Sequence, residues 1–199
     1  AKTAEYLSAQ GATVVLVARN ADKLKSIQTS ISGRSYIVPY DLNDLEHMKT
    51  IFDFCIESGI KLNGMVYCAG VNHDIPVRNN DVGLMCETLT VNYMAFVELC
   101  KYFIKKKYSE DDGSIVAISS LATNRISSGM STYTSSKAAL EAAVKVLAKE
   151  VTKRRIRVNA IAPACVDTEM IDHAPFIKKE ELCHVQPLGL IETAYVSYL

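Results

Sequence analysis

A serine, a tyrosine and a lysine stand close together in the sequence, at Ser120, Tyr133 and Lys137. Tyr133 and Lys137 are four residues apart, so on a helix they share one face about a turn apart. A free phenol, with a pKa near ~10, transfers protons poorly at neutral pH. A nearby ammonium favours the phenolate and lowers that pKa, as acid–base chemistry at pH 7 requires. The three residues therefore predict a proton-transfer site in which the Ser120 hydroxyl can hydrogen-bond a carbonyl oxygen.

The context of these residues is more informative than their spacing, since Tyr102 and Lys106 repeat the Tyr-x-x-x-Lys spacing near the predicted end of another helix. Residues 114–118 predict a buried strand that leads into a Ser-Ser pair. A loop rich in serine and glycine then precedes a helix that is expected to begin at Ser131. Small residues surround the lysine at position 137. The alternative interpretation is a helix start with a solvated lysine and no chemistry.

In this context the stretch resembles the active site of the short-chain dehydrogenase/reductase family, in particular its 3-oxoacyl-carrier-protein-reductase-like branch. The resemblance extends over essentially all 199 residues. It implies that Tyr133 gives a proton to a developing alkoxide, that Ser120 hydrogen-bonds the same oxygen, and that Lys137 binds the nicotinamide ribose. It also implies that Asn92 disturbs a long helix and holds a water linked to the lysine. By itself, an asparagine within a helix is more often a surface residue.

Strand-like and helix-like segments alternate along the chain. Strands are expected at residues 13–18, 35–39, 64–68, 114–118 and 157–161. Helices are expected at residues 1–7, 20–31, 45–58, 84–107 and 131–153. Buried strands separated by helices predict a parallel sheet with helices on both faces. The fold class is therefore α/β, a Rossmann-like doubly wound sheet in one domain, whose ligands bind beyond the carboxyl ends of the strands.

The resemblance also bears on the two ends of the chain. A dinucleotide fold has a first strand and a glycine-rich turn that cradles the pyrophosphate. Compared with the family, the chain begins just after that turn and stops inside the final helix. We therefore expect a fragment, incomplete at both ends, which would itself be inactive. The first strand of the family would stand between residues 13–18 and 64–68, leaving these two strands without a partner between them.

The resemblance assigns further residues to the cofactor site, namely Asp41, Leu42, Cys68, Ala69, Gly70, Val166 and Thr168, besides Tyr133 and Lys137. The first two would meet the adenine, although an aspartate at this place is otherwise an ordinary helix cap. Val166 and Thr168 would hold the carboxamide of the nicotinamide. Two residues depart from the family pattern: Cys68 replaces an asparagine that steadies the sheet, and Ala164 replaces a glycine. Either Ala164 adopts a conformation that alanine tolerates, or its loop shifts.

The choice of cofactor is predicted from charge. An NAD-type site places an acidic residue on the ribose diol about ~20 residues beyond the glycine motif. That place falls at residues 18–20, which hold Arg19 and no acid. A guanidinium can grip a 2′-phosphate in a bidentate fork, so NADP(H) is favoured over NAD(H). Arg19 could instead be a solvated residue that follows a strand.

Composition narrows the class of protein. Lys+Arg 22 and Asp+Glu 22 leave no net charge, so no basic field predicts binding to nucleic acid or anionic lipid. No apolar run approaches the ~20 residues of a membrane span, and no signal peptide opens the chain. The six cysteines contain no C-x-x-C pair and the four histidines have no metal-ligand spacing, which predicts reduced thiols, no metal and a cytoplasmic protein.

The predicted function is that of an NADP-dependent oxidoreductase acting on a small ketone or secondary alcohol. A β-keto thioester is one candidate substrate, and sugar or steroid ketones are others. Residues 124–130 and the segment after Thr168, with Met170, Ile171 and Phe176, should line the substrate pocket. The alternative is a catalytically silent dinucleotide sensor or scaffold. Helices 84–107 and 131–153 are apolar on more than one side, which predicts a homodimer or homotetramer.

Overall fold

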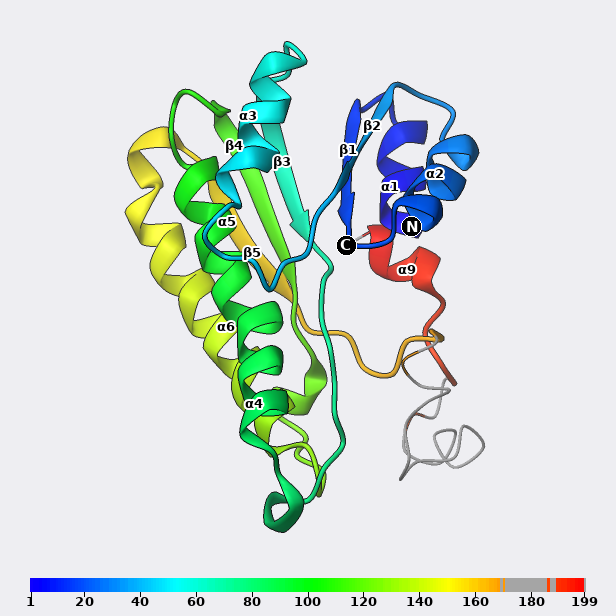
Figure 1. The fold of residues 1–199 in the computed structure, drawn as a ribbon, viewed down its shortest axis with the longest axis vertical. Coiled ribbons are helices and arrows are strands. Elements are labelled where there is room, and N and C mark those ends of the chain that lie inside the picture. The colour runs from blue at the N-terminus through cyan, green and yellow to red at the C-terminus, as the bar shows by residue number, and fades with distance from the viewer. Residues whose placement is uncertain (169, 171–185, 187–188, 199) are drawn as a thin grey trace.

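The computed structural model describes residues 1–168, 170, 186 and 189–198, whose strands form two parallel sheets (Figure 1). The strands are β1 Val14–Ala18, β2 Ser35–Pro39, β3 Leu62–Tyr67, β4 Ser109–Ile118 and β5 Arg157–Ile161. β1 pairs with β2, and the other three lie in the order β3-β4-β5. Within the described residues β1 and β3 do not pair with each other. The division of the sheet at this point agrees with the expectation from the family resemblance.

Helices link the strands and cover them, giving the expected Rossmann-like α/β arrangement. They are α1 Lys2–Ala9, α2 Ala21–Ser30, α3 Lys49–Glu57, α4 Val82–Leu89, α5 Ala95–Phe103, α6 Ser131–Glu150 and α9 Thr193–Tyr198. Helices α1 and α2 pack on the β1–β2 sheet, whereas α5 and α6 pack on the β3–β5 sheet, with α3 against α5 (Figure 1). Helix α9 lies against α1, where the hydroxyl oxygens of Thr3 and Ser197 are 3.2 Å apart.

Two elements, α3 and β4, begin at least four residues away from the predicted position. Helix α3 begins at Lys49 and not at 45, because Asp41 and Asp44 form turns by accepting hydrogen bonds from the backbone N–H groups two and three residues ahead. Strand β4 begins at Ser109 and not at 114. The Arg154 guanidinium fixes that start, donating to the carbonyl oxygens of Ile104 and Ser109 at 2.8 Å each.

The predicted helix 84–107 is interrupted near its middle. It is α4 followed by a π-helical segment, η2 Thr90–Met94, and then by α5, which ends at Phe103. Asp81 caps its beginning by accepting a hydrogen bond from the Leu84 N–H at 3.0 Å. A single turn of π-helix within an α-helix frequently marks a functional site.

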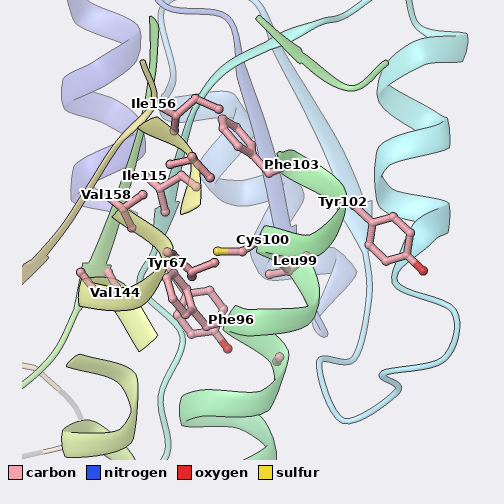
Figure 2. Close-up of a cluster of buried hydrophobic side chains, with 14 of the residues drawn as sticks. Tyr67, Phe96, Leu99, Cys100, Tyr102, Phe103, Ile115, Val144, Ile156 and Val158 are labelled. Atoms are coloured by element: carbon pink, nitrogen blue, oxygen red, sulfur yellow. The ribbon is translucent and has the colours of Figure 1, made fainter. Parts of the chain in front are cut away.

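The main hydrophobic core lies between the β3–β5 sheet and helices α5 and α6 (Figure 2). Phe96, Phe103 and Ile115 are fully buried in it, and the rings of Tyr67 and Phe96 lie 5.5 Å apart. A smaller core of Leu16, Leu24 and Ile31 holds α2 on the β1–β2 sheet. This packing fixes α6 against β4 and β5. It thereby sets the position of the residues of α6 that lie near the carboxyl ends of these strands.

Among the helices that the structure describes, none has the combination of length and apolar character that spanning a bilayer requires.

Candidate active site

Ser120, Tyr133 and Lys137 meet at the carboxyl end of β4, as their spacing predicts. β4 ends at Ile118 and Ser120 follows it, while the other two residues lie in the first turns of α6. The Ser120 side chain lies close enough to the Tyr133 phenol to lower its pKa, and the Lys137 Nζ atom lies 5.9 Å from the centroid of the tyrosine ring. Tyr133 is 9% exposed and Lys137 is 4% exposed. The interpretation of Lys137 as a solvated residue is therefore wrong.

Burial dominates the electrostatics of the two titratable groups. It raises the pKa of Tyr133 above its ordinary value, and the Asp74 carboxylate adds to this, whereas the hydrogen bond from Ser120 lowers the pKa. Burial also lowers the pKa of Lys137 to about 8. The ammonium donates to the carbonyl oxygen of Ile118 at 2.8 Å. The pKa of Tyr133 is therefore raised, opposite to the direction expected from the Tyr133–Lys137 spacing, because desolvation by burial is the largest influence on the phenol.

Asn92 is a buried structural anchor of this site and not a surface residue. It is 0% exposed and lies in the π-helical segment, so the helix is disturbed where the family resemblance implies. Its Oδ1 atom accepts from the Val71 N–H at 2.8 Å, and its Nδ2 atom donates to the Val71 carbonyl oxygen at 2.9 Å. The same nitrogen donates to the Ser136 hydroxyl at 2.9 Å. Asn92 thus ties the loop after β3 to α6.

Ser136 and Gly70 also contribute to the contact between α6 and the loop after β3. Ser136, which the sequence interpretation counted only as a small residue near the lysine, is fully buried and donates to the Tyr133 carbonyl oxygen at 2.7 Å. Gly70 lies against the lysine, since a Cβ atom there would stand 3.3 Å from Lys137 Nζ. Such a contact is tighter than side chains ordinarily make, so glycine at 70 allows the loop and the ammonium to approach closely.

A basic pocket lies at the carboxyl end of β1. It has a volume of about 600 Å³ and is lined by Ala18, Arg19, Asn20 and Lys23. The Asn20 side chain caps α2 by accepting from the Lys23 N–H at 2.9 Å. No carboxylate lines this pocket among the described residues. Two cations beside a helix N-terminus form a donor set that fits a phosphate group. The sequence interpretation named Arg19 but missed Lys23.

The other predicted cofactor residues occupy loops at the same edge. Asp41 accepts from the Asn43 N–H at 3.0 Å in a turn, so it is not a helix cap. Leu42 packs against the main core. Cys68 is exposed just beyond β3, with Ala69 and Gly70 following.

The segment after β5 carries the remaining cofactor positions. Val166 forms an isolated parallel bridge with Ile191. The Thr168 hydroxyl is exposed and donates to the Val166 carbonyl oxygen at 3.3 Å. Ala164 is not among the described residues with positive φ, so it adopts a conformation that alanine tolerates.

A second pocket, of about 560 Å³, lies over the beginning of α6. Its wall comes from residues 126–129, from Pro76 and the first two residues of the short 3-10 helix η1 Val77–Asn79, and from the first turns of α6. Ser120, Tyr133 and Lys137 are not part of this wall. It includes part of the predicted 124–130 lining. Met170 is exposed, while Ile171 and Phe176 lie outside the described residues. In the described part of the chain, no group of three His, Cys, Asp or Glu side chains is arranged to hold a metal ion.

Comparisons with known proteins agree on one family. A sequence model described as short chain dehydrogenase matches residues 1–175. The human protein named 3-oxoacyl-[acyl-carrier-protein] reductase is 28% identical over 196 residues, covering 98% of this chain and 81% of its own length. Carbonyl reductase family member 4 of Danio rerio is 29% identical over 186 residues, covering 93% of this chain and 77% of its own length.

Solved structures share the fold. A dehydrogenase/reductase from Sinorhizobium meliloti 1021 is similar with a TM-score of 0.88 and 26% identity, covering 99% of this chain and 79% of that protein. A short-chain dehydrogenase/reductase from Brucella melitensis has a TM-score of 0.92 at 22% identity, with 99% of this chain and 80% of the other covered. The second likeness concerns the fold alone.

Proposed function

The chain belongs to the short-chain dehydrogenase family of oxidoreductases, and we propose that it interconverts a ketone and a secondary alcohol with NADP(H). The observation that carries this proposal is the convergence of Ser120, Tyr133 and Lys137 at the end of β4, with the serine beside the phenol. Such a convergence supplies a proton donor and an oxyanion partner within one buried site.

Tyr133 is the general acid in the proposed reduction. Its raised pKa keeps the phenol protonated at neutral pH, which is the form that donates to a developing alkoxide. The Ser120 hydroxyl donates a hydrogen bond to the substrate oxygen as charge grows on it. A bound nicotinamide coenzyme would supply the hydride. Lys137, with a pKa of about 8, is mainly charged at pH 7 and, by family resemblance, binds the nicotinamide ribose. Asn92 connects this lysine's surroundings to the loop after β3.

NADP(H) is preferred because of the basic pocket at the end of β1. Arg19 and Lys23 would meet the 2′-phosphate, a dianion that a carboxylate at the same place would repel. By resemblance to the family, we propose that the rest of the coenzyme lies along the same edge. Its proposed contacts are Asp41, Leu42, Cys68, Ala69, Gly70, Val166 and Thr168.

A β-keto thioester is the substrate class that we favour among small ketones. The human relative is named for a 3-oxoacyl substrate on acyl-carrier protein. We also propose a homodimer or homotetramer built from one domain. Met94 in η2 and Val146 in α6 are apolar side chains that are 43% and 55% exposed, and a second subunit would cover them.

The test is NADPH oxidation, followed by its absorbance, with an acetoacetyl thioester and the complete protein. Tyr133→Phe should remove nearly all turnover, since a phenyl ring keeps the packing but has no proton to give. Tyr102→Phe is the matched control, because that tyrosine also has a lysine four residues later but lies in the core beside α3. Retention of more than about a tenth of the rate by Tyr133→Phe corresponds to under ~1.4 kcal/mol of barrier and would rule out Tyr133 as the acid. Binding of NADPH without reduction of any ketone would favour the silent sensor.

A further inference from the structure

Glu141 joins the segment that carries Ser120 to the helix that carries Tyr133. The Ser119 hydroxyl donates to Glu141 Oε1 at 2.6 Å, and the Thr123 hydroxyl lies 3.1 Å from the same oxygen. The Thr123 hydroxyl is also 3.0 Å from the Ser120 carbonyl oxygen, so its single hydrogen is shared between two acceptors. One carboxylate oxygen therefore contacts the residues on both sides of Ser120.

The position of Glu141 in α6 explains how it reaches this segment. It lies four residues after Lys137 and eight after Tyr133, so the three side chains follow one face of the helix. Glu141 is only half-buried, whereas Ser119 is buried. A hydrogen bond from a buried hydroxyl to a carboxylate is shorter and stronger than one between neutral groups.

On the side that faces β5, residues 119–121 are held by backbone hydrogen bonds. The Ser119 N–H donates to the Ile161 carbonyl oxygen at 2.7 Å, and the Leu121 N–H donates to the Pro163 carbonyl oxygen at 2.9 Å. These bonds tie the segment to the end of β5. Toward α6, the Lys137 ammonium holds the preceding residue by donating to the Ile118 carbonyl oxygen at 2.8 Å. Among the described side chains, Glu141 is the α6 residue that makes hydrogen bonds to both Ser119 and Thr123.

We infer that Glu141 is a positioning residue for the reaction proposed above: its carboxylate holds residues 119–123 against α6 so that the Ser120 hydroxyl stays in hydrogen-bonding reach of the Tyr133 phenol. This inference rests on the proposed function. Glu141 has no part in proton transfer itself. Its effect is geometric, and displacement of a reacting group by about 1 Å can cost about 100-fold in rate.

Three variants of the complete protein test the inference. Glu141→Ala removes the acceptor and should lower kcat by about 10- to 100-fold, with the KM for NADPH changed less than about twofold because residues 18–23 are untouched. Glu141→Gln keeps an Oε1 acceptor for both hydroxyls and should restore most of kcat. Glu150→Ala is the matched control, since this glutamate is exposed at the end of the same helix.

A readout independent of turnover accompanies the kinetics. Hydrogen exchange of peptides spanning residues 119–125 should be faster in Glu141→Ala and close to wild type in Glu141→Gln and Glu150→Ala. Unchanged exchange in Glu141→Ala, or an unchanged kcat, would overturn the positioning role. If the wild-type protein binds NADPH but reduces no ketone, the proposed function fails instead, and the exchange pattern alone then decides whether Glu141 holds the Ser120 segment.

Discussion

Replacing Asn92 by alanine should destabilise the protein and disturb the active site together. The Asn92 amide makes three hydrogen bonds, two with the backbone of Val71 and one with the Ser136 hydroxyl. Its truncation leaves the Val71 N–H and carbonyl groups without their partner. Ser136 keeps its bond to the Tyr133 carbonyl oxygen but loses the donor that orients it.

The magnitude follows from the groups that lose their partners. A buried polar group left without a partner costs about 1–3 kcal/mol. The two Val71 groups are half-buried, so the lower part of this range applies to them. The lost donor to Ser136 and the small cavity bring the expected total to about 3 kcal/mol. For a domain of this size, that loss corresponds to a melting temperature lower by roughly 6–12 °C.

Urea unfolding of the complete protein, monitored by circular dichroism, measures this loss of stability. Asn63→Ala is the matched control, because Asn63 is exposed in β3 and should change the free energy of unfolding by less than about 0.5 kcal/mol. The activity of Asn92→Ala should also fall at a temperature where it remains folded. A loss of stability below about 1 kcal/mol would refute the reasoning, since water would then be replacing the Asn92 hydrogen bonds.

An isosteric variant separates the hydrogen bonds from the packing. In Asn92→Asp the side chain keeps its shape and can still accept from the Val71 N–H, but an ionised carboxylate cannot donate to the carbonyl oxygen. Burial should raise the pKa of this new carboxyl in the folded state above its unfolded value. The protonated form is then favoured by folding, so the variant should be less destabilised at pH 4.5 than at pH 8. Equal destabilisation at both pH values would count against a buried site.

Three other results are expected. Arg19→Asp should shift the ratio of specificity constants from NADPH toward NADH, and an unchanged ratio would mean that Arg19 does not contact the 2′-phosphate. The Asp74 carboxylate raises the pKa of Tyr133, so Asp74→Asn should lower that pKa and move the acidic limb of the alcohol-oxidation pH profile to lower pH; a shift to higher pH would contradict it. Light scattering should give a dimer or tetramer at micromolar concentration and a smaller mass for Val146→Asp, whereas a fully active monomer would refute the proposed interface.

The strands and most helices could be predicted because their signals are local. The runs 14–18 and 157–161 become parallel strands with almost the predicted bounds, although only Leu16 and Val158 are buried in them. The first residues of α3 and β4 could not be predicted in the same way. Asp41 and Asp44 compete with helix formation through their own turns, and the start of β4 depends on Arg154, which lies 45 residues away from Ser109 in the sequence.

The site shows the same division between local and distant causes. Tyr133 and Lys137 are recognisable because one helical turn brings them onto one face. Ser136 and Glu141 carry no such signal, because a serine and a glutamate in a helix are common, and their partners here are 44 and 22 residues away. The pKa values could not be predicted from spacing either. Spacing brings the Lys137 ammonium near the Tyr133 phenol, but burial is the largest influence on the pKa of each group. Because burial raises the pKa of Tyr133, the phenol keeps its proton, which is the state that a proton donor for reduction requires.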